Sequence, residues 1–120
     1  MLKKIICTLL TLSGISTIAF ANDFENKLPL AGKTITSQEL QKESIFTVYA
    51  FAQRVAPQNC TEFDIIDTEV SKEKVDNKWQ EIWTVKTCSK TARIPIDFEI
   101  KSNYNIYAID AMGVRVTESK

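Results

Sequence analysis

The pattern of hydrophobic and polar residues changes once along the chain, close to residue 60. Between residues 36 and 55, apolar residues recur about every 3.6 positions, as on one face of an amphipathic helix. After residue 60, apolar and polar residues alternate in short segments, which is typical of half-buried strands. The pattern predicts an α+β fold, with one helix packed on an antiparallel meander sheet of about four strands.

We expect the helix to begin at Thr36, a capping residue with Glu39 three positions later. The apolar positions of the helical period are Leu40, Ile45, Val48, Tyr49, Ala52 and Val55. Pro57 should end the helix, because proline lacks the backbone N–H that a helix interior requires. The competing interpretation is a strand over residues 44–52, which are rich in β-branched and aromatic side chains.

The strand candidates lie at 61–70, 77–88, 92–100 and 104–110, with a short strand or a frayed tail around 114–116. The polar segment 71–77 is interpreted as a turn region. This order of a helix and then a strand meander resembles the rolls of the cystatin and nuclear-transport-factor folds. That comparison is an analogy of element order, and a shared fold does not define a function.

The segment NKWQEIWTVKTC, residues 77–88, contains both tryptophans and fits either a helix face or a strand. If Cys60 lies opposite Cys88 in an antiparallel pair, Ile65 faces Trp83. A following hairpin with a four-residue loop around 89–90 would place Trp83 opposite Ile96. All the large apolar side chains then share one face, and a slip by one residue would scatter them, so we predict a strand.

Trp83 is expected in the core, whereas Trp79, nearer the end of the strand, can be buried or available to a partner. Glu81, between them, falls on the apolar face, with Asp67 beside it in this register. Such a carboxylate pair can perform acid–base chemistry on a sugar or ester. The alternatives are a salt bridge from Glu81 to a helix cation, Arg54 or Lys42, a β-bulge that turns it outward, or a different register. The face away from the helix is predicted to carry Asp64, Thr68, Gln80, Thr84, Lys86, Arg93, Pro95 and Asp97.

Residues 1–21 have the three parts of a secretory signal peptide. Lys3 and Lys4 precede an uncharged apolar stretch, and the small residues Ala19 and Ala21 end it. We expect cleavage after Ala21 and a periplasmic or secreted protein without a membrane span. The alternative is an uncleaved N-terminal anchor. Residues 22–35 would form an extended lead-in, and residues 36–120 a single domain.

Cleavage would leave 99 residues, with 13 of the 15 basic residues and all 15 acidic ones, a net charge near −2. The basic residues are scattered, whereas nucleic-acid binders cluster them on one face, so no nucleic-acid partner is expected. Cys60 and Cys88 would be the two remaining cysteines, and an oxidising compartment favours a disulfide between them.

Few residues suit catalysis or metal binding. The chain has no histidine, no glycine-rich phosphate loop and no C-x-x-C pair, so neither a histidine-based catalytic triad nor a zinc site is expected. We therefore predict a non-enzymatic protein without cofactor or metal, and assign no catalytic residues.

One motif resembles a group of small exported proteins of Gram-negative bacteria. It consists of W-x-E-x-W-T-V-x-x-C followed by I-P-I-x-F, at Trp79, Glu81, Trp83, Thr84, Val85, Cys88, Ile94, Pro95, Ile96 and Phe98. The resemblance covers residues 37–100 and implies a periplasmic location and the Cys60–Cys88 pair, but no catalytic residues. Members of the group usually have glycine after the second cysteine, where this chain has Ser89.

These observations favour a non-catalytic binding or interaction module, for which an inhibitor is one possible type, with an unknown protein or small-molecule partner in the periplasm. Trp79, Glu81 and Asp67 are the candidate interaction residues. One alternative is a carrier that holds an apolar ligand between helix and sheet, which needs a cavity behind Trp83 and Phe98. The other is a small hydrolase that uses Asp67 and Glu81 in one cleft.

Overall fold

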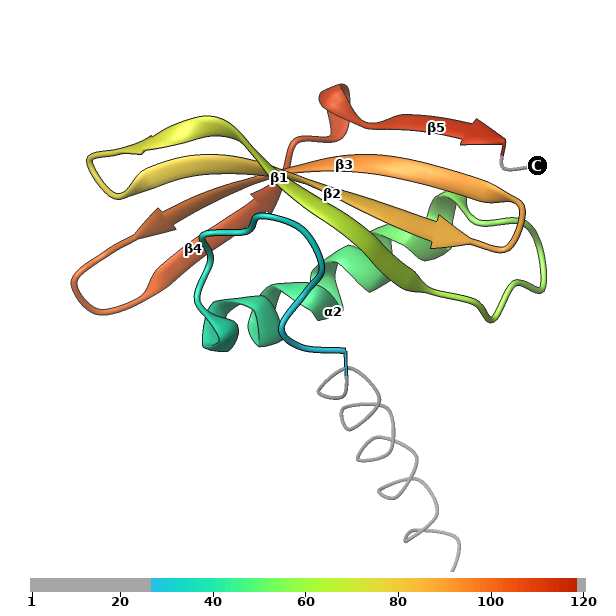
Figure 1. Ribbon diagram of the computed structural model, residues 1–120, viewed down its shortest axis with the longest axis horizontal. Helices are drawn as coiled ribbons and strands as arrows, with labels where there is room; N and C mark the ends of the chain where they lie inside the picture. The colour runs from blue at the N-terminus through green and yellow to red at the C-terminus, as the bar shows by residue number, and fades with distance from the viewer. Residues whose placement is uncertain (1–26, 119–120) are drawn as a thin grey trace, which may run out of the picture.

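The computed structural model describes residues 27–118, so the predicted signal peptide and its cleavage site lie outside the described residues. The elements are helix α2 (Gln38–Val55), strands β1 (Asp64–Val75), β2 (Lys78–Thr87), β3 (Lys90–Ile100) and β4 (Asn105–Ile109), the 3-10 turn η1 (Ala111–Gly113) and strand β5 (Arg115–Glu118). The predicted α+β fold is confirmed: one helix packs on one antiparallel sheet (Figure 1).

The helix runs over almost the predicted range, but its cap differs. Ser37, not Thr36, is the N-cap, and its hydroxyl accepts a hydrogen bond from the Leu40 N–H. The helix ends at Val55, two residues before Pro57. The alternative strand over 44–52 is therefore excluded.

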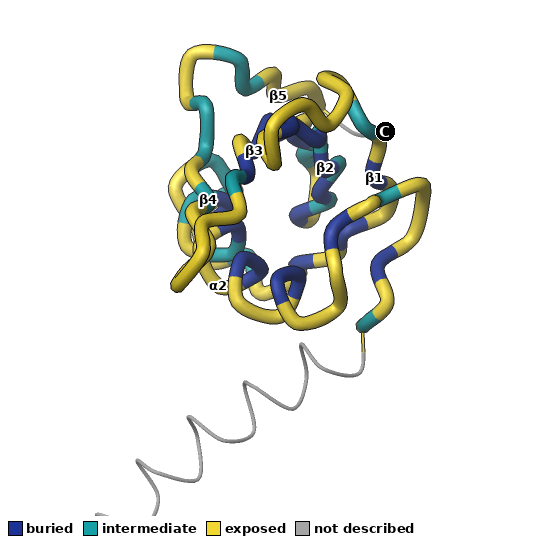
Figure 2. Tube along the Cα trace, turned by 90° about the vertical axis from the view of Figure 1, so that its left-hand side faces the viewer, coloured by how far each residue is buried: buried dark blue, intermediate teal, exposed yellow. Residues whose placement is uncertain are grey.

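The sheet is a meander in the order β1-β2-β3-β4, and β5 pairs with the other half of the β3 edge. The strands curl over α2, so that buried positions line the inside of the roll (Figure 2). The face of the sheet packed on α2 is called the inner face here, and the opposite one the outer face. The turn η1 lies on the outer face, where Gly113 packs against the Pro95 ring.

The register between β1 and β2 differs from the prediction. Ile65 lies opposite Val85, two positions from the expected partner Trp83. Cys60 precedes β1 and bridges to Cys88 from a loop, so the disulfide does not define the strand pairing. The segment 71–77 is mostly strand, because β1 continues to Val75 and only two residues form the turn.

The β2–β3 hairpin is also shifted by two positions. Trp83 lies opposite Ile94 rather than Ile96, and Thr87 pairs with Lys90 across a two-residue turn in place of the expected four-residue loop. Cys88, in that turn, has φ of +52°, a backbone conformation in which residues other than glycine are uncommon. Because side chains alternate with a period of two, a two-residue shift leaves every β2 and β3 side chain on its predicted face.

A bulge in β1 does move side chains. The pairing jumps between Ile65 and Asp67, so that one extra residue is accommodated and Thr68 turns inward. Thr68 is 1 % exposed and its hydroxyl donates to the Ala31 carbonyl. Its predicted place on the outer face is therefore wrong.

The lead-in is part of the folded unit. Leu30 belongs to the core, and the Lys33 N–H donates to the carbonyl of Thr68 at the edge of β1. Gly32, with φ of +99°, permits this approach: a Cβ there would lie 2.4 Å from the backbone N and O of Thr68.

Candidate functional site

Glu81 is a buried anchor for the lead-in. It is 0 % exposed and points into the inner face between the two tryptophans. Both indole N–H groups donate to its carboxylate, Trp79 Nε1 at 3.1 Å and Trp83 Nε1 at 3.0 Å. The neighbouring Phe98 ring stacks on Trp79 with centroids 5.2 Å apart.

The lead-in and Thr36, which follows it directly, supply three further donors to the same carboxylate. They are the Thr34 hydroxyl at 2.6 Å, the Ile35 backbone N–H at 3.0 Å and the Thr36 hydroxyl at 2.8 Å. A buried carboxylate is tolerated where enough hydrogen bonds replace its water. Neither a salt bridge to Arg54 or Lys42 nor an outward bulge is needed, because five donors from two parts of the chain satisfy the group.

Asp67 lies elsewhere. It is exposed on β1, where it pairs with Thr84, whereas Val70 is the residue opposite Glu81. The structure therefore does not bring Asp67 and Glu81 together. Trp79 is buried, with 4 % exposure, so of its two expected environments the core is the one found.

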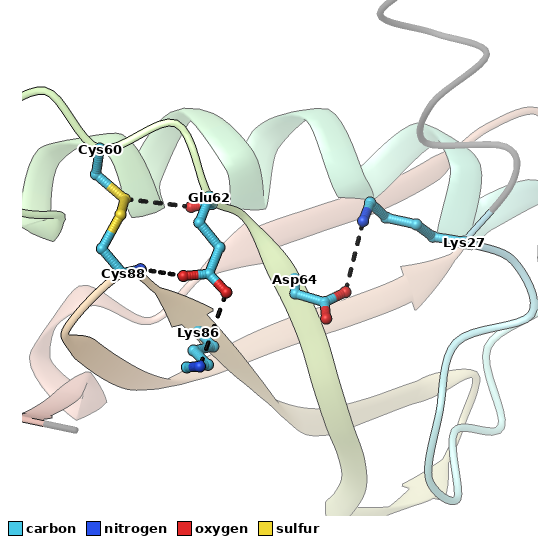
Figure 3. Close-up of polar contacts among 6 residues, drawn as sticks. All are labelled: Lys27, Cys60, Glu62, Asp64, Lys86 and Cys88. Atoms are coloured by element: carbon cyan, nitrogen blue, oxygen red, sulfur yellow. Dashed lines mark hydrogen bonds and ion pairs between the residues drawn. A yellow bond between two sulfur atoms is a disulfide. The ribbon is translucent and has the colours of Figure 1, made fainter. Parts of the chain in front are cut away.

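The disulfide joins the loop after α2 to the β2–β3 turn, with Cα atoms 6.1 Å apart (Figure 3). The Glu62 carboxylate accepts from the Cys88 backbone N–H at 2.8 Å and lies 3.8 Å from Lys86 Nζ. A Glu62–Lys86 ion pair thus forms although the strand partner of Lys86 is Asp64. The cross-link and this ion pair hold the β2–β3 turn beside the start of β1.

A hollow of about 370 Å³ lies on the outer face, near the β1–β2 and β3–β4 turns. We call it the outer hollow. It is lined by Lys72, Glu73, Val75, Lys78, Trp79, Asp97, Phe98, Glu99, Ile106 and Ala108.

Strand pairing arranges most of these side chains in two rows that cross the sheet. One row is Lys72, Gln80, Asp97 and Ala108, and the other is Val75, Lys78, Glu99 and Ile106. Each row has a cation on the β1–β2 side, an anion on β3 and an apolar side chain on β4. Trp79 and Phe98 point to the inner face, so their backbone lies beneath the outer hollow.

The charges of the outer hollow differ in how they are neutralised. Glu99 lies 2.8 Å from Lys101 Nζ and 3.9 Å from Lys78 Nζ. The hydrogen bond from Lys101 lowers the pKa of the Glu99 carboxyl, and the same bond raises the pKa of the Lys101 amine. Asp97 instead accepts a hydrogen bond at 3.0 Å from the neutral amide of Gln80.

Elsewhere on the outer face, charged and apolar side chains are both exposed. Arg93 pairs with Glu69, and Ile66 is 45 % exposed. Of the side chains that line the outer hollow, Asp97 is the one that the sequence pattern predicted on the outer face. The alternation in residues 104–110 could have indicated Ile106 and Ala108 as outward side chains, but their neighbours depend on the register.

Within residues 27–118, no three His, Cys, Asp or Glu side chains gather in a way that could hold a metal ion. No helix of that part of the chain is long and apolar enough to cross a membrane. Comparisons with protein-family models, with curated proteins and with solved structures give no significant match.

Proposed function

We propose that this protein is a small exported binding protein that holds its partner in the outer hollow and catalyses no reaction. The observation that carries the proposal is the outer hollow itself. Its volume of about 370 Å³ falls within the range of specific binding sites, which combine apolar surface with a few placed polar groups. The apolar surface comes from Val75, Ile106 and Ala108, and the charges come from Lys72, Glu73, Lys78, Asp97 and Glu99.

The way in which the outer hollow is built supports this proposal. Its side chains stand on four hydrogen-bonded strands, and sites on strands are held more rigidly than sites on loops. A preorganised surface loses less entropy when a partner binds. Export is supported by the N-terminal pattern and by the disulfide, because disulfides persist in oxidising compartments.

The interior gives less support to the carrier and hydrolase alternatives. Trp83 is 0 % and Phe98 2 % exposed, and the Glu81 carboxylate occupies the space between the indoles. An apolar ligand there would have to displace a fully hydrogen-bonded charge. A hydrolase would need Glu81 at a cleft with Asp67, and the two lie apart.

The test is a nuclear magnetic resonance titration of the oxidised exported protein with pooled random peptides. We expect a bound pool to shift the resonances of Val75, Ile106 and Ala108. Ala108→Trp, which fills the outer hollow, should weaken binding at least about tenfold, since it removes the contact surface. Thr84→Trp, on the same face outside the outer hollow, is the matched control and should bind as the wild type does.

Two results would refute the proposal. One is that no pool shifts these resonances. The other is that Ala108→Trp binds normally while remaining folded by circular dichroism. Export is tested separately by the mass of the protein recovered from the periplasm of a Gram-negative host, which should begin at Asn22. A full-length chain kept at the membrane would contradict it.

A further inference from the structure

One charged side chain of the outer hollow is held in place by a buried neighbour. Gln80 is only 7 % exposed although it lies on the outer face. Its Nε2 donates to Asp97 Oδ1 at 3.0 Å, and its Oε1 accepts from the Ser71 hydroxyl at 2.7 Å. A hydrogen-bond chain therefore runs from β1 through β2 to β3 and ends on the Asp97 carboxylate.

Asp97 is also an anion without a cation. Within residues 27–118, the ion pairs neutralise Glu99 through Lys101 and Lys78, and none includes Asp97. Lys72 lies in the same row across the strands and also has no ion-pair partner among the described residues. Its side chain is longer than that of Asp97 and loses more rotamer entropy when a ligand fixes it. Asp97 is thus the preorganised charge of the site.

Apolar surface lies beside this carboxylate. Ala108 is the strand partner of Asp97, and Ile106, 37 % exposed, lies one row further along β4. Val75, 65 % exposed, lies at the β1 end of the row that contains Ile106. Lysine and arginine side chains pack their alkyl stems on apolar surface and keep the charged head hydrogen-bonded.

We propose that the outer hollow binds a lysine or arginine side chain of a partner polypeptide, with the stem on Ile106 and Ala108 and the head on Asp97. This proposal rests on the proposed function and names the chemistry of its partner. Lys72 and Lys78 at the rim repel a molecule with several positive charges, so a polypeptide with one basic residue suits the site better than a free polyamine. Gln80 acts as a positioning residue.

The test uses the acetylated peptide Gly-Ala-Arg-Ala-Gly-amide, its lysine form, and forms with citrulline or glutamate in place of arginine. Binding is followed by the Ala108 and Ile106 resonances. We expect the arginine and lysine peptides to bind at least about threefold more tightly than the citrulline peptide, the range of an exposed ion pair. The preference should shrink in 0.5 M salt, about five times the ionic strength at which the screening length is ~10 Å.

Two variants locate the charge. Asp97→Asn should remove the preference for arginine over citrulline. Asp64→Asn, an equal change of charge at the other end of the same face, should leave it intact. Gln80→Leu should reduce the preference while citrulline binding stays unchanged, because the carboxylate is no longer oriented. A merely structural role of Gln80 would weaken both peptides equally.

Equal binding of the arginine and citrulline peptides, or a preference that survives Asp97→Asn, would overturn the proposal but leave the outer hollow as a binding site. Tighter binding of the glutamate peptide would assign the site to Lys72 and an anion. Binding of spermidine at least as tight as that of the peptides, or ligand-free shifts that depend on protein concentration, would replace the partner by a polyamine or a second copy. If neither these peptides nor any of the random pools bound, the proposed function would be refuted as well.

Discussion

Two neighbouring residues of β2, Gln80 and Glu81, show how differently the two faces of this sheet use a buried polar side chain. Glu81, on the inner face, is closed off by five donors from β2, the lead-in and Thr36. Gln80, on the outer face, makes two hydrogen bonds, and its chain of contacts ends at exposed Asp97.

The difference separates stability from recognition. A buried network whose hydrogen bonds are all formed stabilises one arrangement of the chain and has no donor or acceptor left to bind a partner. A network that ends at the surface holds a charged group in place while leaving part of that group open. The acid between the tryptophans, which the sequence suggests as half of an acid–base pair only in an alternative interpretation, is the structural one.

The largest expected effect is on the inner face. Glu81→Ala should lower the free energy of unfolding by about 4 kcal/mol, because it leaves two indoles and a backbone N–H without an acceptor in the core. Urea unfolding of the oxidised protein measures it. The Ile35 amide should also lose its protection from hydrogen exchange, whereas a loss below 1 kcal/mol would show that the anchor is dispensable.

Removal of the disulfide should cause the second largest loss in the free energy of unfolding. Replacing both Cys60 and Cys88 by alanine frees a loop whose ends are 28 residues apart, for which the chain-entropy model gives about 3.6 kcal/mol. The comparison is made by urea unfolding against the oxidised wild type. An unchanged unfolding midpoint would mean that the loop is already restrained without the bond.

Gly32→Ala probes the contact between the lead-in and β1. We expect a loss of about 2 kcal/mol, because the residue has positive φ and its Cβ would overlap the Thr68 backbone. Thermal unfolding detects the loss. Gly113→Ala is a milder control, since the nearest atom, at 2.9 Å, belongs to the Pro95 side chain.

Gln80→Leu sharpens the contrast with Glu81. This substitution should lower the free energy of unfolding by no more than about 1 kcal/mol, because Ser71 and Asp97 can form hydrogen bonds with water in place of those with Gln80. Urea unfolding gives the value. A cost as large as that of Glu81→Ala would make the outer network structural too.

The smallest effect concerns pH at the edge of the outer hollow. The pKa of Glu99 is lowered, so its contribution to stability is present above its unfolded pKa and is lost as the pH falls through the folded value. Lys101 shows the opposite pH dependence, because its pKa is raised. Its contribution to stability is present below its unfolded pKa and is lost as the pH rises through its folded pKa. An NMR titration should find the Glu99 pKa restored towards its usual value in Lys101→Met, and an unchanged value would contradict the assigned cause.

The register illustrates how far sequence reasoning reaches. The hydrophobic alternation correctly places Trp83, Val85, Ile94 and Ile96 on one face, because that result depends only on whether a position is odd or even in its strand. It misses the actual partners by two positions throughout the β2–β3 hairpin, and by two or more in the β1–β2 pairing, where bulges add to the shift. A disulfide limits the distance between two Cα atoms, but it aligns strands only if both cysteines lie in them, and Cys60 does not.

The bulge near Ile66 and the contacts of Glu81 could not be predicted from the sequence, for a related reason. Three of the five donors to Glu81 lie 45 to 47 residues before it in the chain, and no local pattern links them to it. Thr36 illustrates the consequence: it has the local features of a helix cap, yet its hydroxyl is used by Glu81, and Ser37 caps the helix instead.

The amino-acid sequence by itself determined the order of helix and strands, the inner face of β2 and β3, and the pairing of the cysteines, because these follow from local periodicity and composition. Only the tertiary structure decided which strand positions meet, what surrounds Glu81, and where Asp97 stands relative to Ala108. Those features depend on long-range contacts, in which a bulge or a two-residue turn changes the neighbours of every side chain beyond it.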